Sequence, residues 1–195
     1  MICLRLSPSS LRVVPMDPFE LLGLPHRPLL SEEEIGQAYR RLAGELHPDQ
    51  AGGDANRFKE LGEAAAILRD PTRRLRSLSG VSGGSQLPPR AAELFPKIAT
   101  MLREADALIG KHQAASNPLA KAVLAAPLKK LAADLDGLLG ILHGWHSSLD
   151  AHLTLIENTW PSHDPEGVAS LADSFAYSSR WESQLRERKL TLDCL

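Results

Sequence analysis

Apolar residues recur at alternating spacings of three and four through the first third of the chain. Between residues 31 and 46 they fall at Ile35, Tyr39, Leu42 and Leu46, and a second stripe between residues 56 and 68 consists of Phe58, Leu61, Ala65 and Leu68. Spacings of three and four place such residues on one face of an α-helix. The turn-forming residues between the two stripes predict two antiparallel helices joined at a tip.

A longer pattern of the same kind occupies the C-terminal half. One stripe runs from Leu128 to Trp160 in a sustained heptad, preceded by a stripe over residues 94–108 and followed by one over residues 171–185. Three amphipathic stretches of this kind are typical of a small bundle. We expect Asn117-Pro118 and Pro127 to break the chain ahead of the longest helix. No stretch alternates with the period of a strand, so the predicted fold class is all-α.

Local signals set the expected boundaries. Ser31 with Glu34 forms a capping box, and Asp70-Pro71 and Asp164-Pro165 pair a cap with a first-turn proline. A short helix is expected over residues 18–23, which makes four helices in the first domain. The predicted division is a disordered extension at 1–15, a first domain at 16–78, a linker at 79–89 that is rich in Gly, Ser and Pro, and a helical bundle at 90–192.

Composition excludes several classes of function. The 195 residues carry a net charge of −2, so there is no global basic field to attract nucleic acid, and the low aromatic content of 5% leaves most of the packing to Leu and Ala, which favours helices. The two cysteines lie at opposite ends, which suits a reducing compartment and excludes a cysteine-based zinc site. No run approaches the length of a membrane helix. We therefore expect a cytoplasmic protein that binds neither nucleic acid nor membranes.

The tripeptide His47-Pro48-Asp49 ends the first long helical stretch, because Pro48 disfavours helical backbone at His47. It stands between Tyr39-Arg40-Arg41-Leu42-Ala43 and Phe58-Lys59-Glu60-Leu61, in an order and spacing that resemble a J-domain. The resemblance implies that His47, Pro48 and Asp49, with the basic residues Arg40 and Arg41, bind a DnaK- or HscA-class chaperone and stimulate its ATPase. It also implies a co-chaperone that is not itself an enzyme and needs no cofactor.

The layout of a J-domain, a short linker and a three-helix bundle resembles the HscB family. That resemblance implies that the bundle binds a client, an IscU-type iron–sulfur scaffold, through residues that include Met101, Leu102, Glu104 and Phe175. Of the acidic and apolar run typical of the family, only Leu102-Arg103-Glu104 is present here. From the two-domain layout we predict a role in iron–sulfur cluster assembly or in protein folding.

Two other possibilities concern the long helix. His143, His146 and His152 lie close together on it, but no motif supplies a further ligand, and we predict no metal site. In the alternative function, the J-like fold is only a scaffold and the helical hairpin mediates assembly. The sequence leaves the oligomeric state open between a monomer and a weak dimer.

Overall fold

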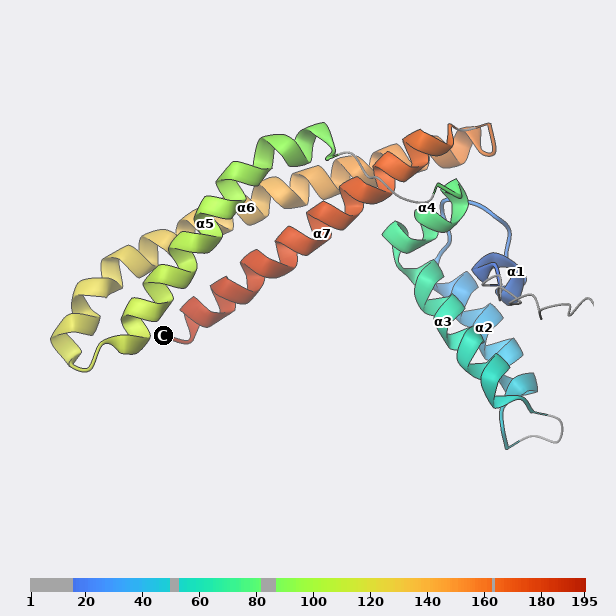
Figure 1. Ribbon diagram of the computed structural model, residues 1–195, viewed down its shortest axis with the longest axis horizontal. Helices are drawn as coiled ribbons and strands as arrows, with labels where there is room; N and C mark the ends of the chain where they lie inside the picture. Colours follow the sequence, from blue (N-terminus) through green and yellow to red (C-terminus); the bar gives the residue numbers. More distant parts are fainter. Residues whose placement is uncertain (1–15, 50–52, 82–86, 163) are drawn as a thin grey trace, which may run out of the picture.

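The computed structural model describes residues 16–49, 53–81, 87–162 and 164–195, and the predicted extension at 1–15 lies outside them. The described residues form seven α-helices and no strand, which confirms the all-α fold (Figure 1). The helices are α1 (Pro18–Leu22), α2 (Glu32–Leu46), α3 (Ala55–Arg69), α4 (Pro71–Ser79), α5 (Pro89–Ala114), α6 (Pro118–Thr159) and α7 (Pro165–Asp193).

Helices α1, α2 and α3 enclose a small core of their own, to which α4 adds only the partly buried Leu78. Helices α2 and α3 run antiparallel, and α1 packs across both of them. The buried side chains include Phe19 from α1, Ile35 from α2, and Leu61 and Leu68 from α3. The predicted capping box is present, because Ser31 accepts from the Glu34 backbone N–H while the Glu34 carboxylate accepts from that of Ser31. The box fixes the start of α2, at the end of the helix opposite to the tip of the hairpin.

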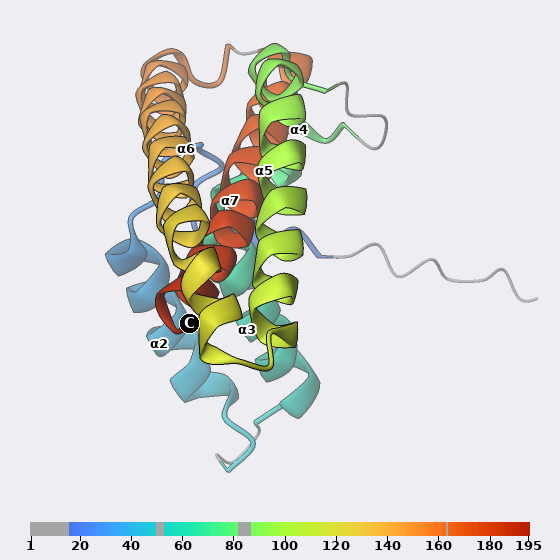
Figure 2. The ribbon, with the colours of Figure 1, turned by 90° about the vertical axis from the view of Figure 1, so that its left-hand side faces the viewer.

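Helices α5, α6 and α7 form an elongated three-helix bundle (Figure 2). The predicted heptad of α6 is its buried face, and the stripe of α7 around Phe175 and Trp181 packs against it. Because this apolar face is covered inside the molecule, the heptad is used to fold the bundle. The confirmed stripes thus account for most of the larger core.

One prediction about the bundle is wrong. Pro127 does not break the chain, because α6 is one helix of 42 residues that continues through it, and α5 likewise continues through Pro96. Both prolines lie on exposed helix faces. The carbonyl that each proline leaves without an intrahelical donor can therefore be solvated, and packing on the opposite face keeps the helix continuous. Asn117-Pro118 behaves as predicted and caps the start of α6.

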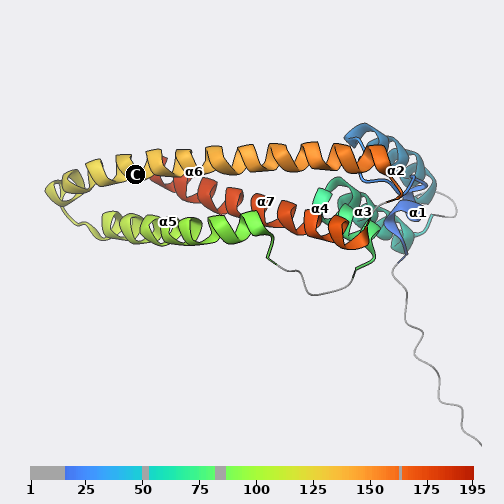
Figure 3. The same ribbon diagram turned by 90° about the horizontal axis from the view of Figure 1, so that it is seen from above.

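The two domains are docked, with the four short helices at one end of the bundle (Figures 1 and 3). Helix α4 packs against α7, and its Leu75 is completely buried in the core of the bundle. Leu78 contacts both cores. A linker of this composition allows independent domains as well as docked ones, so the docking is decided by these long-range contacts. Within the described residues, none of the helices combines the length and the hydrophobicity that a membrane span requires.

Candidate functional site

The tripeptide His47-Pro48-Asp49 lies at the free tip of the α2–α3 hairpin, away from the bundle (Figure 1). His47 has extended backbone (ψ 131°) and ends α2, as the proline after it requires. The side chain of Asp49 is 87% exposed and that of His47 is 46% exposed. The carboxylate is therefore available to a partner with little desolvation by its own chain.

Contacts within the tip fix the imidazole. The backbone N–H of Asp49 donates to Nδ1 of His47 at 3.2 Å, which leaves Nε2 as the donor of the neutral ring. The ring also meets the edge of Phe58 at a centroid distance of 5.5 Å. The Asp49 carboxylate lies 3.6 Å from the same Nδ1, so the two side chains of the tripeptide lie side by side.

Gly53 closes the tip by a close backbone approach that the sequence pattern signals only as a turn residue. A Cβ atom at this position would lie 1.9 Å from the carbonyl oxygen of His47. One residue further, the backbone N–H of Asp54 donates to the carbonyl of Leu46 at 3.2 Å, and Asp54 caps α3. The two helix ends are thus joined by backbone contacts that only glycine permits at residue 53.

Arg40 and Arg41 are exposed on α2, less than three turns from the tip. The guanidinium of Arg40 lies over Gly36, and that of Arg41 reaches toward Gly23 at the end of α1. Within the described residues neither guanidinium forms an ion pair. Together with the tip they form a surface on which two guanidinium groups without an ion pair lie near the exposed carboxylates of Glu45 and Asp49.

The residues expected to bind a client do not share one surface. Met101 and Leu102 are half-buried on α5, and Glu104 is exposed on the next turn. Phe175 is buried on α7, 1% exposed, with the edge of its ring against His146 at 5.3 Å. Met101, Leu102 and Glu104 are therefore accessible on α5, whereas Phe175 supports the core beneath α6 and α7.

Of the three histidines on α6, His146 packs inside the bundle, whereas His143 and His152 are exposed. His146 lies within hydrogen-bonding distance of the Ser178 hydroxyl, at 3.3 Å, and packs on Phe175. In the described part of the chain no group of three or more His, Cys, Asp or Glu side chains is arranged to hold a metal ion. His143 and His152 lie on the same helix without joining such a group.

Comparison with known proteins matches the first domain to a protein family. The family model described as "DnaJ domain" matches residues 17–76. The chain is 44% identical over 79 residues to "Chaperone protein DnaJ" of Tropheryma whipplei, a match that covers 40% of this chain and 22% of that protein. It is 43% identical over 56 residues to "Protein SIS1" of Saccharomyces cerevisiae, over 29% of this chain and 15% of that protein. The chain thus spans less than a quarter of these curated relatives.

Among solved structures, "Chaperone HscB from Vibrio cholerae" is similar over most of the chain. The match covers 88% of this chain and 96% of that chain, with 16% sequence identity and a TM-score of 0.48.

Proposed function

We propose that this chain, whose residues 17–76 are a DnaJ domain, is a co-chaperone that stimulates ATP hydrolysis by a DnaK- or HscA-class chaperone. The observation that carries the proposal is the exposed carboxylate of Asp49, held on a closed loop inside that domain and away from the bundle. The chain itself breaks no bond in this proposal. It acts by binding the chaperone, and we place that activity in the cytoplasm.

The chemistry of the loop suits a charge-assisted contact. A carboxylate fixed on a short loop can accept hydrogen bonds from an arginine of the partner and draw that arginine from its internal contacts. His47 supports this geometry, because its ring accepts the backbone N–H of Asp49 and rests on Phe58. Arg40 and Arg41 would face acidic residues of the chaperone and raise the rate of encounter.

The bundle would bind the client. Met101, Leu102 and Glu104 offer half-buried apolar side chains next to an exposed carboxylate on α5, a combination that suits a partner surface with apolar and basic groups. We propose an IscU-type iron–sulfur scaffold as this partner. Phe175 is not part of the proposed contact surface, because reaching it requires the core to open.

The alternative function, assembly through the long helix, gains no support from the heptad. The heptad residues from Leu131 to Ile156 are all buried and pack against α5 and α7. A face that is covered within the chain is not available to a second copy.

Single-turnover ATP hydrolysis by a purified DnaK-class chaperone tests the proposal, with the wild-type chain and Asp49→Asn. The substitution removes the charge from an exposed side chain, so helicity stays unchanged while stimulation falls by about tenfold or more, as expected when roughly 1.4 kcal/mol or more of a charged contact is lost. Glu60→Gln, an exposed carboxylate on α3, is the matched control and keeps full stimulation. Undiminished stimulation by Asp49→Asn would refute the role of the loop.

The same assay with an IscU-type scaffold tests the client. Stimulation that rises with the scaffold, and rises less with Met101→Ser and Glu104→Gln, supports the proposed surface on α5. If the scaffold does not change the stimulation, the bundle binds a different client, and the proposed role of the loop is unaffected.

A further inference from the structure

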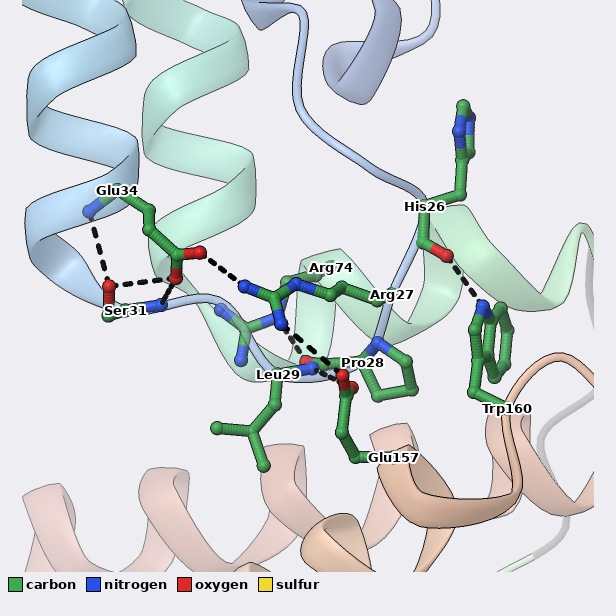
Figure 4. A network of polar contacts seen from close by, with 9 residues as sticks. All are labelled: His26, Arg27, Pro28, Leu29, Ser31, Glu34, Arg74, Glu157 and Trp160. Atoms are coloured by element: carbon green, nitrogen blue, oxygen red, sulfur yellow. Dashed lines mark hydrogen bonds and ion pairs between the residues drawn. The ribbon is translucent and has the colours of Figure 1, made fainter.

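A polar network joins the two domains at a second place, separate from the packing of α4 on α7 (Figure 4). The segment from His26 to Leu29, between α1 and α2, lies against the end of α6. Glu157 of α6 accepts the backbone N–H of Leu29 at 2.8 Å and lies 3.5 Å from the Arg27 guanidinium. The indole N–H of Trp160 donates to the carbonyl of His26 at 2.5 Å.

Arg27 extends this network to the start of α2. Its guanidinium pairs with Glu34, the carboxylate of the capping box, as well as with Glu157. Behind the segment, the buried Arg74 of α4 donates to the carbonyls of Pro28 and Leu68. Burial lowers the pKa of Arg74, an effect that the charges of Asp70 and Glu157 partly oppose. The segment is thus held from both sides.

The geometry of the attachment decides how freely the DnaJ domain can turn. The first contact, Leu75 in the bundle core with the Arg76–Asp173 ion pair at 2.9 Å, joins α4 to α7. A single line of contact between two domains permits rotation about that line. The second contact is made with α6 and not with α7, so it is a separate point of attachment that would oppose such a rotation.

The second contact acts on the helix that carries the functional loop. Glu34 lies at the first turn of α2, and His47 ends the same helix. At 1.5 Å per residue its 15 residues span about 22 Å. A small angular movement at the Glu34 end therefore displaces the loop by several times the movement at the contact itself.

We propose that Glu157 is a positioning residue, which sets the direction of the His47–Asp49 loop relative to the bundle through Leu29 and Arg27. The inference rests on the proposed function in one respect. If the loop binds a chaperone and α5 binds a client, the docked domains hold these two partners in one fixed arrangement. The loop acts on the chaperone, and Glu157 determines where that chaperone is placed.

Distances between spin labels test this role directly on the full chain. The labels are attached at Glu45→Cys on α2 and Ala107→Cys on α5, both exposed, with Cys3 and Cys194 replaced by serine. The parent shows a narrow distance distribution, which Glu157→Ala broadens without loss of helicity. Glu157→Gln broadens it less, since its amide oxygen still accepts from Leu29. Asp150→Ala, an exposed carboxylate on the same helix, leaves it narrow. A distribution for Glu157→Ala as narrow as that of the parent overturns the proposal.

The ATPase assay separates this inference from the proposed function. Without a client, Glu157→Ala stimulates the chaperone as well as the parent does, because its loop is intact. With an IscU-type scaffold as the probe, Glu157→Ala lacks the additional stimulation that the scaffold produces with the parent. If Asp49→Asn keeps its stimulation, the proposed function fails and the distance result stands by itself. If the distances do not respond to Glu157→Ala, the positioning role fails whatever the ATPase shows.

Discussion

At the residue scale, the shape of the loop depends on the close approach of Gly53 to the backbone carbonyl of His47. The tripeptide supplies the groups that a partner would contact, whereas Gly53 allows α3 to begin next to the end of α2. Glycine-containing turns are common, and a turn pattern does not say whether a Cβ atom would fit. This constraint was therefore not predictable from the sequence, although the position of the turn was.

Gly53→Ala is expected to disturb the loop more than the fold. The added Cβ would overlap the backbone carbonyl of His47, so the backbone at His47 and Pro48 must shift and the orientation of Asp49 changes with it. We expect a weaker stimulation of the chaperone at equal concentration, measured by single-turnover hydrolysis, with a thermal midpoint that changes little.

Gly44→Ala is the matched control for this change. A Cβ at Gly44 meets no atom within 4 Å, and the residue lies inside α2, so alanine should stabilise the fold by about 0.5–1 kcal/mol. Full stimulation by Gly53→Ala would show that the close approach does not position the loop.

At the element scale, the caps and the apolar stripes were predictable because each rests on neighbours in the sequence. Ser31, Asp70 and Asp164 each accept from backbone N–H groups of the helix that follows, as their positions predict. Pro127 shows where local reasoning fails, since the proline disfavours a helix that the packing of Leu131 and its neighbours nevertheless maintains.

The capping box of α2 should make stability depend on pH in acid. Hydrogen bonds from the Ser31 backbone N–H and then its hydroxyl hold the pKa of Glu34 below its usual value; desolvation opposes them, and Arg27 adds a weaker lowering effect. A carboxyl with a lowered pKa in the folded state stabilises the fold fully above its unfolded-state pKa of about 4.3. That contribution is lost as the pH falls through the folded-state pKa.

Denaturant unfolding between pH 7 and pH 2 measures this effect. The stability of the parent relative to Glu34→Gln should decline below about pH 4.3, because glutamine can still fill the capping box but does not titrate. Glu33→Gln, one residue away and outside the box, is the control. A constant difference between the parent and Glu34→Gln across this range would contradict the interpretation.

Pro127→Ala is expected to stabilise the protein. Alanine restores the backbone N–H in an exposed part of α6 and relieves the clash with the preceding turn, a gain of about 1–3 kcal/mol. Pro118→Ala is the control, since a proline in the first turn costs no intrahelical hydrogen bond and its replacement should change little. Chemical denaturation of both variants checks the difference, and an unchanged midpoint for Pro127→Ala would mean that α6 has already adapted to the proline.

At the scale of the whole molecule, the decisive contacts join residues that are far apart in the sequence. Leu29 and Glu157 are 128 positions apart, and Arg76 and Asp173 are 97 apart. No local pattern identifies such pairs, because Glu157 on an amphipathic helix and Arg76 on a short one both read as ordinary surface residues. The docking, and with it the placement of the loop relative to α5, therefore became visible only in the three-dimensional arrangement.

Leu75 provides the strongest test of the docking. It belongs to α4 by sequence but is fully buried in the core of the bundle, so the stability of each domain includes contacts supplied by the other. Two domains that share a core in this way should unfold together in a single calorimetric transition. Leu75→Ala should cost about 2–5 kcal/mol, as for other large-to-small core changes, and should divide that transition into two.

The matched control is Leu119→Ala, since Leu119 is 77% exposed on α6 and its truncation should leave one transition at nearly the parental temperature. If Leu75→Ala lowers the midpoint but keeps a single transition, the coupling does not depend on this side chain and the polar network at Glu157 suffices to hold the domains together. If the parent already shows two transitions, the domains unfold independently, and the fixed direction of the loop must then arise without a shared core.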